Sequence, residues 1–382
     1  MSDDKLLLIP GPSPVHPRIL EALARPTVSH VSSVLAEEFE AALDNLKEIV
    51  FTKQGEPFVV AGAGTLSMEM ALVNTVGRDD RALILSQGYF GDRLAQICQG
   101  FGLAFDLLAS PWGRAVAAED LEKQLARADY GVVVATHVDT ATGACAPVKD
   151  YARVLRGREI LFIVDGVCAT GGIEERMDDW GLDVILTAAQ KCFGAPPGLA
   201  ITIFSPRAMA NRQSLKSVPA YYADILRWLP IMKDPRRYFS TPCVNEIRAF
   251  SEATRIIMEE GLESRFARHA RTAEAIRAGL RALGFSFFTE EAFLADTLSV
   301  VVYPPGLEDQ AFRARYFEEG VVVAGGLAET SGRVFRMGHM GNLTSDQALF
   351  ALEALERTLK SLGHRFAPGS GRKAAAEVLA QP

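Results

Sequence analysis

The sequence predicts an α/β protein with a mainly parallel central sheet sandwiched by helices, followed by a smaller α+β domain at the C-terminal end. Over residues 57–204, short runs of aliphatic and β-branched residues alternate with helical patterns, as expected for parallel strands joined by crossover helices. After residue 283 the pattern changes to shorter, mixed elements. A chain of 382 residues, 48% of them hydrophobic, is also long enough for two cores.

The elements of the large domain are expected after a proline-rich opening at residues 10–14. Proline lacks a backbone donor, so this opening can be neither regular helix nor central strand. An amphipathic helix is expected at 37–50. The apolar, β-branched runs predict strands at 57–61, 82–86, 104–108, 131–136, 160–165, 183–187 and 199–204. The helical patterns between them predict helices at 66–76, 92–100, 118–126 and 148–155.

The rest of the chain is expected to be organised differently. Residues 244–283 contain few helix breakers and predict one long helical region. Further elements are predicted at 297–303, 310–318, 321–323, 334–337 and 345–359. We therefore expect four parts: an N-terminal arm at the active site (1–15), a large domain (16–255), a small C-terminal domain (256–365) and a loose tail (366–382) with a short helix at 373–379.

The composition excludes several classes of function. The formal charge of −7 gives no reason to expect nucleic-acid binding, and no apolar run is long enough to cross a membrane. The first residues lack the basic and apolar regions of a signal peptide. The five cysteines are scattered without pairing or metal-ligand spacing, so we expect reduced thiols, no metal site and a cytoplasmic protein.

Lys191 and Asp165 are the most informative residues. Lys191 follows the predicted strand at 183–187, and Asp165 ends the apolar strand before it. A lysine and an aspartate at the ends of neighbouring strands can hold a pyridine ring between them. The lysine then forms a Schiff base and the aspartate keeps the ring nitrogen protonated, as pyridoxal phosphate requires. Taken singly, each residue could equally be a surface lysine or a strand-capping aspartate.

A glycine-rich loop at residues 61–67 is a candidate phosphate site. Ligands of parallel α/β sheets bind at the carboxyl ends of the strands, and this loop, with Gly64 and Thr65, lies between such an end and a helix N-terminus. A structural tight turn explains the same glycines. Gln190, directly before Lys191, is a second group that can reach a phosphate.

Two other strand ends carry aromatic and polar candidates. Phe90, with Tyr89 as second choice, can stack on a flat cofactor or belong to the core. Thr140 lies in a polar run directly after a predicted strand and can bond a phenolic oxygen of the cofactor. His137, in the same run, is expected to have a structural role.

Two polar segments outside these loops suit anionic groups. Residues 236–242 combine arginine, tyrosine and hydroxyl groups, which favours phosphate binding or an ordinary polar loop. Arg336 alternates with the apolar Phe335 and Met337, so it faces away from them. Its guanidinium can bind a substrate carboxylate at two points, or be an exposed strand arginine.

Taken together, these motifs resemble the class V (fold type I) PLP-dependent aminotransferases, specifically the alanine–glyoxylate and serine–pyruvate branch. The resemblance extends from residue 6 to about residue 362. The motifs that carry it are Pro-Gly-Pro near the start, Gly-x-Gly-x5-Glu at 62–69, Thr-His-x-Asp-x2-Thr-Gly at 136–143, Val-Asp-x-Val at 164–167, Gln-Lys-x3-Ala-Pro-Pro-Gly at 190–198, Tyr-x2-Thr at 238–241 and Arg-x-Gly at 336–338.

The resemblance implies a role for each matching residue. Lys191 would carry the cofactor as a Schiff base, Asp165 would pair with the ring nitrogen, and Arg336 would bind the substrate carboxylate. The other cofactor contacts would come from Val167 and Phe90 on the two ring faces, Thr140 near the phenolic oxygen, Gly64, Thr65 and Gln190 around the phosphate, and Tyr238 and Thr241 at the phosphate of a neighbouring subunit. The site would therefore be shared across a homodimer.

The chain departs from relatives of this family at four positions, one of which is Ala63 in place of the usual serine. Phe90 stands in place of a tryptophan, Thr65 in place of a histidine and Thr140 in place of a serine. These changes keep the chemistry but leave the amino donor open. We expect PLP-dependent ping-pong transamination between alanine or serine and glyoxylate or pyruvate, with ureidoglycine–glyoxylate or pyridoxamine–pyruvate exchange as the alternative within the family.

Three other functions are less favoured by the sequence. A PLP-dependent lyase or cysteine desulfurase would need a cysteine on a flexible loop, and none of the five cysteines lies in an evident Gly/Ser-rich loop. A nicotinamide-binding enzyme would rest on Gly62-Ala-Gly64 alone. A non-catalytic relative is disfavoured because Lys191, Asp165 and Arg336 are all present.

Overall fold

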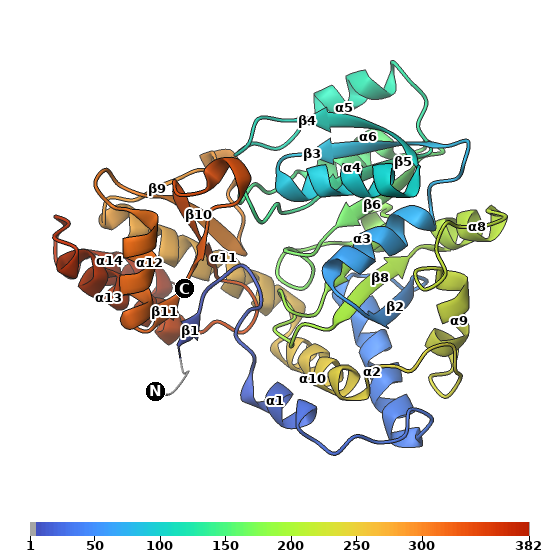
Figure 1. The fold of residues 1–382 in the computed structure, drawn as a ribbon, viewed down its shortest axis with the longest axis horizontal. Helices are drawn as coiled ribbons and strands as arrows, with labels where there is room; N and C mark the ends of the chain where they lie inside the picture. Colours follow the sequence, from blue (N-terminus) through green and yellow to red (C-terminus); the bar gives the residue numbers. More distant parts are fainter. Residues whose placement is uncertain (1–4, 382) are drawn as a thin grey trace.

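The computed structural model describes residues 5–381, which form a larger and a smaller part (Figure 1). The larger part is built on a seven-stranded sheet in the order β2-β8-β7-β6-β5-β3-β4. Strand β8 pairs antiparallel with β2 and β7, and the other pairings are parallel, so the sheet is mainly parallel as predicted. Its strands are β2 (Glu56–Ala61), β3 (Arg81–Ser86), β4 (Ala104–Ala109), β5 (Val132–Thr136), β6 (Leu161–Asp165), β7 (Val184–Ala188) and β8 (Leu199–Phe204).

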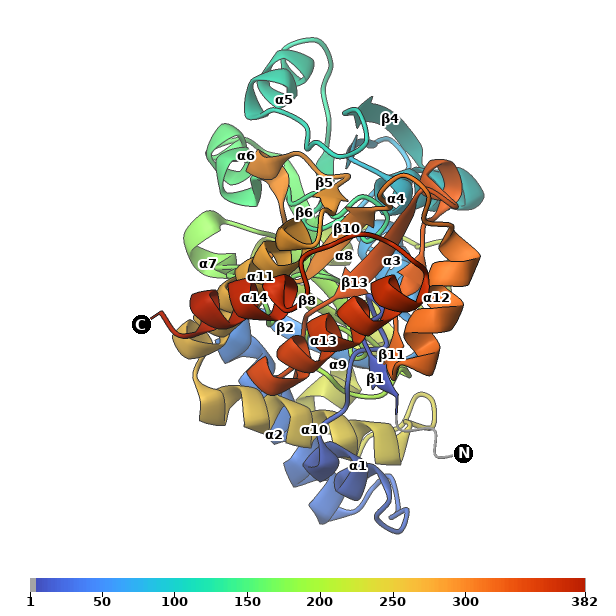
Figure 2. The same ribbon diagram turned by 90° about the vertical axis from the view of Figure 1, so that its left-hand side faces the viewer.

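Helices cover both faces of this sheet, which explains why its central strands are almost entirely apolar. Every residue of β5, β6 and β7 is buried, as expected for a strand with helices on both sides. Helices α3 and α4 pack together on one face, whereas α6 and α7 lie on the other (Figure 2). The helices of this part are α1 (Pro17–Leu23), α2 (Ser33–Ile49), α3 (Gly64–Val73), α4 (Tyr89–Phe101), α5 (Ala118–Leu125), α6 (Val148–Leu155), α7 (Met177–Trp180), α8 (Pro206–Ser214), α9 (Ile225–Lys233) and α10 (Val244–Glu260).

Helices α1, α7, α8 and α9 were not predicted from the hydrophobic pattern. They are only four to nine residues long, so a period of 3.6 residues is hard to detect in them. Two of them carry a start signal instead. Ser205 accepts a hydrogen bond from the backbone of Ala208 (3.0 Å) with Pro206 in the first turn of α8, and α1 begins in the same way with a proline.

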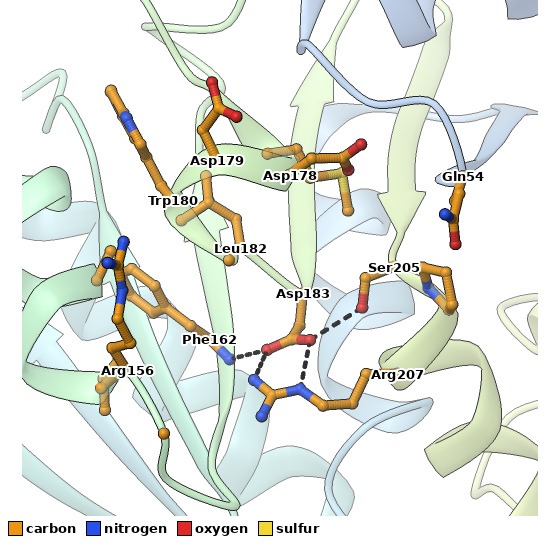
Figure 3. Close-up of a pocket in the computed structure, with 16 residues that line it drawn as sticks. Gln54, Arg156, Phe162, Asp178, Asp179, Trp180, Leu182, Asp183, Ser205 and Arg207 are labelled. Atoms are coloured by element: carbon orange, nitrogen blue, oxygen red, sulfur yellow. Dashed lines mark hydrogen bonds and ion pairs between the residues drawn. The ribbon is translucent and has the colours of Figure 1, made fainter.

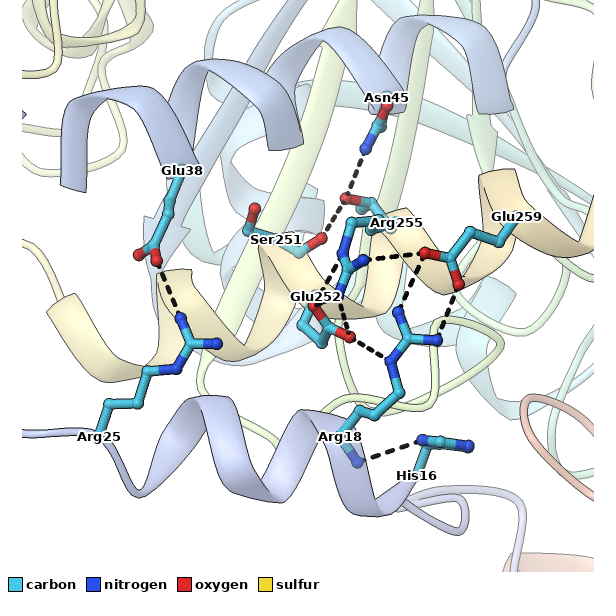
Figure 4. Close-up of polar contacts among 10 residues, drawn as sticks. His16, Arg18, Arg25, Glu38, Asn45, Ser251, Glu252, Arg255 and Glu259 are labelled. Atoms are coloured by element: carbon cyan, nitrogen blue, oxygen red, sulfur yellow. Dashed lines mark hydrogen bonds and ion pairs between the residues drawn. The ribbon is translucent and has the colours of Figure 1, made fainter. Parts of the chain in front are cut away.

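Helix α1 is fastened to α10 by a network of ion pairs (Figure 4). Arg18 of α1 donates to Glu252 (2.6 Å) and Glu259 (2.7 Å), both on α10. Arg255 donates to the same two carboxylates from within α10, at 2.6 and 2.9 Å. The residues that follow the N-terminal arm are therefore held to the larger part.

The smaller part is an antiparallel sheet covered by helices. Its strands pair in the order β12-β13-β10-β9, and the arm adds β1 in parallel to β11. The strands are β1 (Leu6–Leu7), β9 (Ser286–Phe287), β10 (Leu298–Val302), β11 (Val321–Val322), β12 (Ala324–Gly325) and β13 (Val334–Gly338). The helices are α11 (Leu262–Ala282), α12 (Asp309–Glu318), α13 (Ser345–Ser361) and α14 (Ser370–Leu379), with short 3-10 turns η1 (Glu291–Phe293) and η2 (Ala328–Thr330).

The long helical region predicted at residues 244–283 is two helices. Helix α10 ends and α11 begins at Gly261, whose φ of +81° lies in the left-handed region and interrupts the helix. The buried apolar side chains of α10, up to Ile257, belong to the core of the larger part. Those of α11, from Ala275 onwards, belong to the core of the smaller part. The domain boundary near residue 255 stays a prediction that agrees with this division.

The short helix predicted at residues 373–379 is present as α14, but this part of the tail is packed against the protein and is not loose. Residues 370–379 form α14, which packs against α11 and α13 with Ala375 fully buried. The carboxylate of Glu356 on α13 accepts hydrogen bonds from the backbone of Gly369 (2.6 Å) and Gly371 (3.0 Å) at the start of α14. Such long-range contacts cannot be read from the local pattern Pro-Gly-Ser-Gly. None of the helices within residues 5–381 has the length and apolar character to cross a membrane.

Candidate active site

The carboxyl ends of β5, β6 and β7 bring the central candidates together. Asp165 is the last residue of β6 and lies beside Leu186 of β7 and Thr136 of β5 in the parallel register. Lys191 is the third residue after the end of β7 at Ala188. Asp165 and Lys191 therefore project from neighbouring strand ends, as the sequence predicted, at the edge where α/β sheets bind ligands.

Asp165 is a buried carboxylate, and few groups of the protein stabilise its negative charge. Its side chain is 1% exposed and accepts a hydrogen bond from the backbone of Val167 (3.0 Å). Burial raises the pKa of Asp165 to about 7, the Val167 bond opposes this, and the carboxylates of Asp139 and Glu175 raise it further. A cationic partner, such as a protonated ring nitrogen, would stabilise the ionised form.

Lys191 is half-buried and contacts the N-terminal arm. Its amine donates a hydrogen bond to the carbonyl oxygen of Pro10, and the hydroxyl of Ser13 donates to the Lys191 carbonyl (2.6 Å). The backbone of Ser13 also donates to the carbonyl of Gln190 (3.1 Å). Residues 10–13 of the arm thus lie directly against the lysine, and residues 1–4 of the predicted arm lie outside the described residues.

The predicted phosphate site has the features that an anion requires. Helix α3 begins at Gly64, and its N-cap residue, Ala63, has no capping side-chain hydrogen bond, so the amides of the first turn can receive an anion. The side-chain oxygen of Gln190 is buried without a hydrogen-bond partner. The amides of this first helical turn fit the phosphate of pyridoxal phosphate, and the amide nitrogen of Gln190, not its oxygen, is the side-chain atom that can donate to it.

Phe90 and Thr140 are linked by a residue that the sequence reasoning missed. Asp139 is fully buried and accepts hydrogen bonds from the backbone of Phe90 (2.8 Å), Ala141 (2.8 Å) and Thr142 (3.3 Å). It therefore holds the first turn of α4, which carries Phe90, against the loop that carries Thr140. The signal was present, because an aspartate next to Thr140 in a polar loop is a common backbone acceptor.

Close contacts around Phe90 and Thr140 define their surroundings further. The guanidinium of Arg93 lies over the Phe90 ring at 4.7 Å from its centroid, a cation–π contact that fixes the ring. The hydroxyl of Thr140 lies 2.9 Å from the sulfur of Cys168, which follows Val167. Thr140 is therefore in contact with the residue next to Val167.

Arg336 reaches from the smaller part to the loops of the larger part. Its guanidinium donates to the carbonyl oxygens of Gly325 (2.8 Å) and Thr140 (3.4 Å). Burial lowers the pKa of Arg336, and no carboxylate within residues 5–381 forms an ion pair with it. A half-buried guanidinium held by carbonyls but lacking an acid is suited to a substrate carboxylate.

Within residues 5–381, the side chains of Tyr238 and Thr241 form no hydrogen bond with the other candidate residues. Tyr238 is 64% exposed, and its hydroxyl lies 3.4 Å from that of Thr241. Its ring contacts His30 at a centroid distance of 5.5 Å. Exposure of both groups on the surface agrees with a role towards a second subunit and does not test it.

A buried polar network lies next to the end of β6, the strand that carries Asp165. His137 shares a hydrogen bond with Glu175 (2.6 Å), and Glu175 also accepts one from Thr170 (2.6 Å). Burial alone would lower the pKa of His137, but the neighbouring Cys145 and Glu175 raise it to about 10. A Cβ on Gly166 would lie 2.1 Å from the Thr170 hydroxyl, so only glycine fits next to Asp165. The structural role expected for His137 agrees with this network.

A cavity lies away from this site, and the carboxylate at its wall is already hydrogen-bonded within the protein. It has a volume of about 630 Å³ and lies near the amino ends of β6 and β7 (Figure 3). The carboxylate of Asp183 at its wall already accepts hydrogen bonds from the backbone N–H of Phe162 (2.8 Å), the hydroxyl of Ser205 (2.9 Å) and the guanidinium of Arg207 (2.9 Å). No candidate residue lines it, and ligands of parallel sheets bind at the opposite strand ends.

Comparison with known proteins identifies the family. The model of the family "Aminotransferase class-V" matches residues 18–331. The L-aspartate–glyoxylate aminotransferase of Paracoccus denitrificans is 34% identical over 100% of this chain and 98% of its own. The serine–glyoxylate aminotransferase of Arabidopsis thaliana is 31% identical, covering 98% of this chain and 94% of its own.

A solved structure is similar over the whole chain as well. The ureidoglycine–glyoxylate aminotransferase of Bacillus subtilis has a TM-score of 0.94, with 26% identity over 100% of this chain and 99% of its own. The family, the fold and the site residues agree on the cofactor. The chain belongs to the class V aminotransferases and is a fold type I, pyridoxal 5'-phosphate-dependent enzyme that catalyses transamination.

Proposed function

We propose that this aminotransferase transfers the amino group of a small amino acid, alanine or serine, to glyoxylate or pyruvate in a ping-pong cycle. The observation that carries the proposal is Arg336, a half-buried guanidinium held beside Thr140, with no acidic partner among residues 5–381. Its position suits the α-carboxylate that amino acids and 2-oxo acids share. Two relatives whose names specify glyoxylate as acceptor, each at least 31% identical, favour glyoxylate.

The proposed division of labour follows the chemistry of each group. When bound, pyridoxal phosphate supplies an electron sink for the electrons of the substrate Cα–H bond. Lys191 would hold the cofactor covalently, and its amine, when free, would take the proton from the substrate Cα. Asp165 holds a proton on the ring nitrogen. Arg336 orients the carboxylate so that the Cα–H bond stands perpendicular to the ring.

The remaining residues are proposed to bind the cofactor. Gly64, Thr65 and Gln190 would hold its phosphate, Phe90 and Val167 would cover the ring, and Thr140 would bond the phenolic oxygen. Tyr238 and Thr241 would complete the phosphate site of a partner subunit, so we propose a homodimer. The five free cysteines support a reducing, cytoplasmic location.

The first experiment tests whether Lys191 binds the cofactor and is needed for transamination. Purified protein should show an absorption band of bound cofactor, and borohydride should fix the cofactor to Lys191, as read by mass spectrometry. Lys191→Ala should abolish transamination, whereas Lys216→Ala, at an exposed position, should not change it. Failure to bind the cofactor, or fixation at another lysine, would refute the assignment.

A matrix of donors and acceptors then separates the substrates. Alanine, serine, aspartate, ureidoglycine and pyridoxamine are each assayed with glyoxylate and with pyruvate. We expect the highest kcat/KM for alanine or serine with glyoxylate. A clear preference for ureidoglycine or pyridoxamine would establish the alternative within the family instead.

The shared site has its own test. When subunits carrying Lys191→Ala and Tyr238→Ala are mixed, a hybrid dimer has one site with both changes and one site with neither. One of the two sites in each hybrid dimer should therefore be fully active. The mixture should show more activity than either parent, because the Lys191→Ala parent is inactive and the Tyr238→Ala parent is weak. No recovery would place Tyr238 in the site of its own subunit, or outside any site.

A further inference from the structure

The N-terminal arm connects the two residues that handle substrate and proton. The backbone of Gly338, at the end of the Arg336 strand, donates a hydrogen bond to the carbonyl of Leu8 (2.8 Å). Five residues later, Ser13 bonds the carbonyl groups of Gln190 (3.1 Å) and Lys191 (2.6 Å). The segment between these two anchor points, residues 9–12, is therefore fixed at both ends and passes the Lys191 side chain.

Within this segment, the carbonyl oxygen of Pro10 faces the Lys191 amine. It is the hydrogen-bond acceptor of the amine, and no carboxylate within residues 5–381 forms an ion pair with Lys191. The rings of Pro10 and Pro12 restrict the backbone on either side of Gly11. The acceptor is thus held in place by the backbone, without a flexible side chain.

Gly11 gives the Lys191 side chain the room it occupies. A Cβ on Gly11 would lie 2.5 Å from Cδ, 2.8 Å from Cε and 2.9 Å from Nζ of Lys191. A Cβ essentially never comes within 3.0 Å of a heavy atom of a residue that is not its chain neighbour, so any side chain at this position would displace the lysine. The φ of Gly11, +94°, also lies in the region that favours glycine.

We propose that Pro10 and Gly11 form a docking position for the Lys191 amine, which holds the amine whenever it is not bonded to the cofactor. This rests on the role proposed above for Lys191. A carbonyl oxygen accepts an N–H of the neutral amine and leaves the nitrogen lone pair free to take the proton from the substrate Cα. Once the amine is an ammonium, the same bond becomes charge-assisted and stronger. The lysine is then kept in place until it gives the proton up.

This arrangement makes Pro10 and Gly11 positioning residues. The carbonyl does not exchange a proton, because an amide oxygen is a far weaker base than an amine. Its effect is to restrict a long side chain that would otherwise have many rotamers. Because the arm is also bonded to Gly338, two residues after Arg336, the positions of amine and carboxylate are coupled through one short segment.

The test is Gly11→Ala with Gly306→Ala as the matched control. Gly306 has a similar φ of +87°, but a Cβ there would have nothing within 4 Å, so it carries the backbone penalty without the collision. Gly11→Ala should lower kcat by about 100-fold, the size expected when a reacting group is misplaced by about 1 Å. The KM for the amino acid should change little, since Arg336 is untouched. The rate of covalent cofactor uptake by the apoprotein, followed by absorbance, should fall as well.

A double-mutant comparison separates positioning of the lysine from a general effect on the fold. In Lys191→Ala protein, activity is supplied by added ethylamine. The Gly11→Ala change should have little effect in this background, because the side chain with which its methyl group collides is gone. An equal loss in both backgrounds, or a Gly11→Ala enzyme within twofold of Gly306→Ala, would overturn the proposal. Borohydride fixation of the cofactor elsewhere than Lys191 in the unmodified protein would instead refute the assignment of the lysine itself.

Discussion

Arg265 offers the sharpest test of how the active-site loops are held. Its side chain is completely buried at the start of α11. It donates to the carbonyl of Gly171 (2.7 Å), six residues after Asp165, and to the carbonyl of Cys192 (2.5 Å), directly after Lys191. A third bond joins it to Glu260 (2.7 Å). One guanidinium therefore ties the loops that follow Asp165 and Lys191 to the helix that begins the smaller part.

Replacing Arg265 by leucine should cost about 3 kcal/mol of folding free energy. The change leaves two buried carbonyl oxygens without donors, each worth about 1–3 kcal/mol. Relief from burying the guanidinium, whose pKa is lowered by that burial, offsets part of this loss. Glu260 does not become unpaired, because Arg268 still donates to it at 2.6 and 3.1 Å. About 3 kcal/mol corresponds to roughly a 100-fold change in the folding equilibrium.

The assay is urea unfolding of the apoproteins, followed by circular dichroism, with Arg255→Leu as the control. Arg255 also makes several ion pairs, shown in Figure 4, but its side chain is 57% exposed. Screening by solvent limits its contribution to about 1 kcal/mol or less. A loss for Arg265→Leu no larger than that for Arg255→Leu would refute the reasoning. Arg265→Leu should also weaken cofactor retention, since both loops lose their anchor.

Two further predictions concern the carboxylates of the site. Burial raises the pKa of Asp165 from its ordinary value of 3.8 to about 7 in the folded chain. The folded protein therefore binds the Asp165 proton more tightly than the unfolded chain does. The stability that this proton contributes is fully present below pH 3.8 and is lost as the pH rises through 7. Relative to the unmodified apoprotein, Asp165→Asn should therefore gain melting temperature between pH 4.5 and 7.5; a constant difference would contradict this. The substitution Asp139→Asn replaces one of the two acceptor oxygens by an amide nitrogen, which is a donor and would face backbone N–H groups. The dissociation constant for pyridoxal phosphate, measured by absorbance titration, should therefore rise about tenfold. An unchanged constant would show that Asp139 does not position Phe90 and Thr140.

The accuracy of the sequence predictions followed the physical origin of each signal. Strands β5 to β7 were predicted to within a residue or two, because burial on both faces makes them almost entirely apolar. The break at Gly261 and the packing of α14 were missed. The first depends on one backbone angle and the second on contacts with α11 and α13. Neither leaves a periodic pattern in the chain.

The sequence by itself determined the chemistry. A lysine and an aspartate after neighbouring parallel strands must lie at one edge of the sheet, since the topology of such sheets brings their carboxyl ends together. The family motifs then pointed to the cofactor, and the comparisons confirmed the class of enzyme. Only the tertiary structure decided how these groups are held. The contacts of Pro10 and Gly11 with Lys191, of Asp139 with Phe90, and of Arg265 with both loops join residues that are 49 to 181 positions apart. Such contacts depend on packing between segments, which no local pattern encodes.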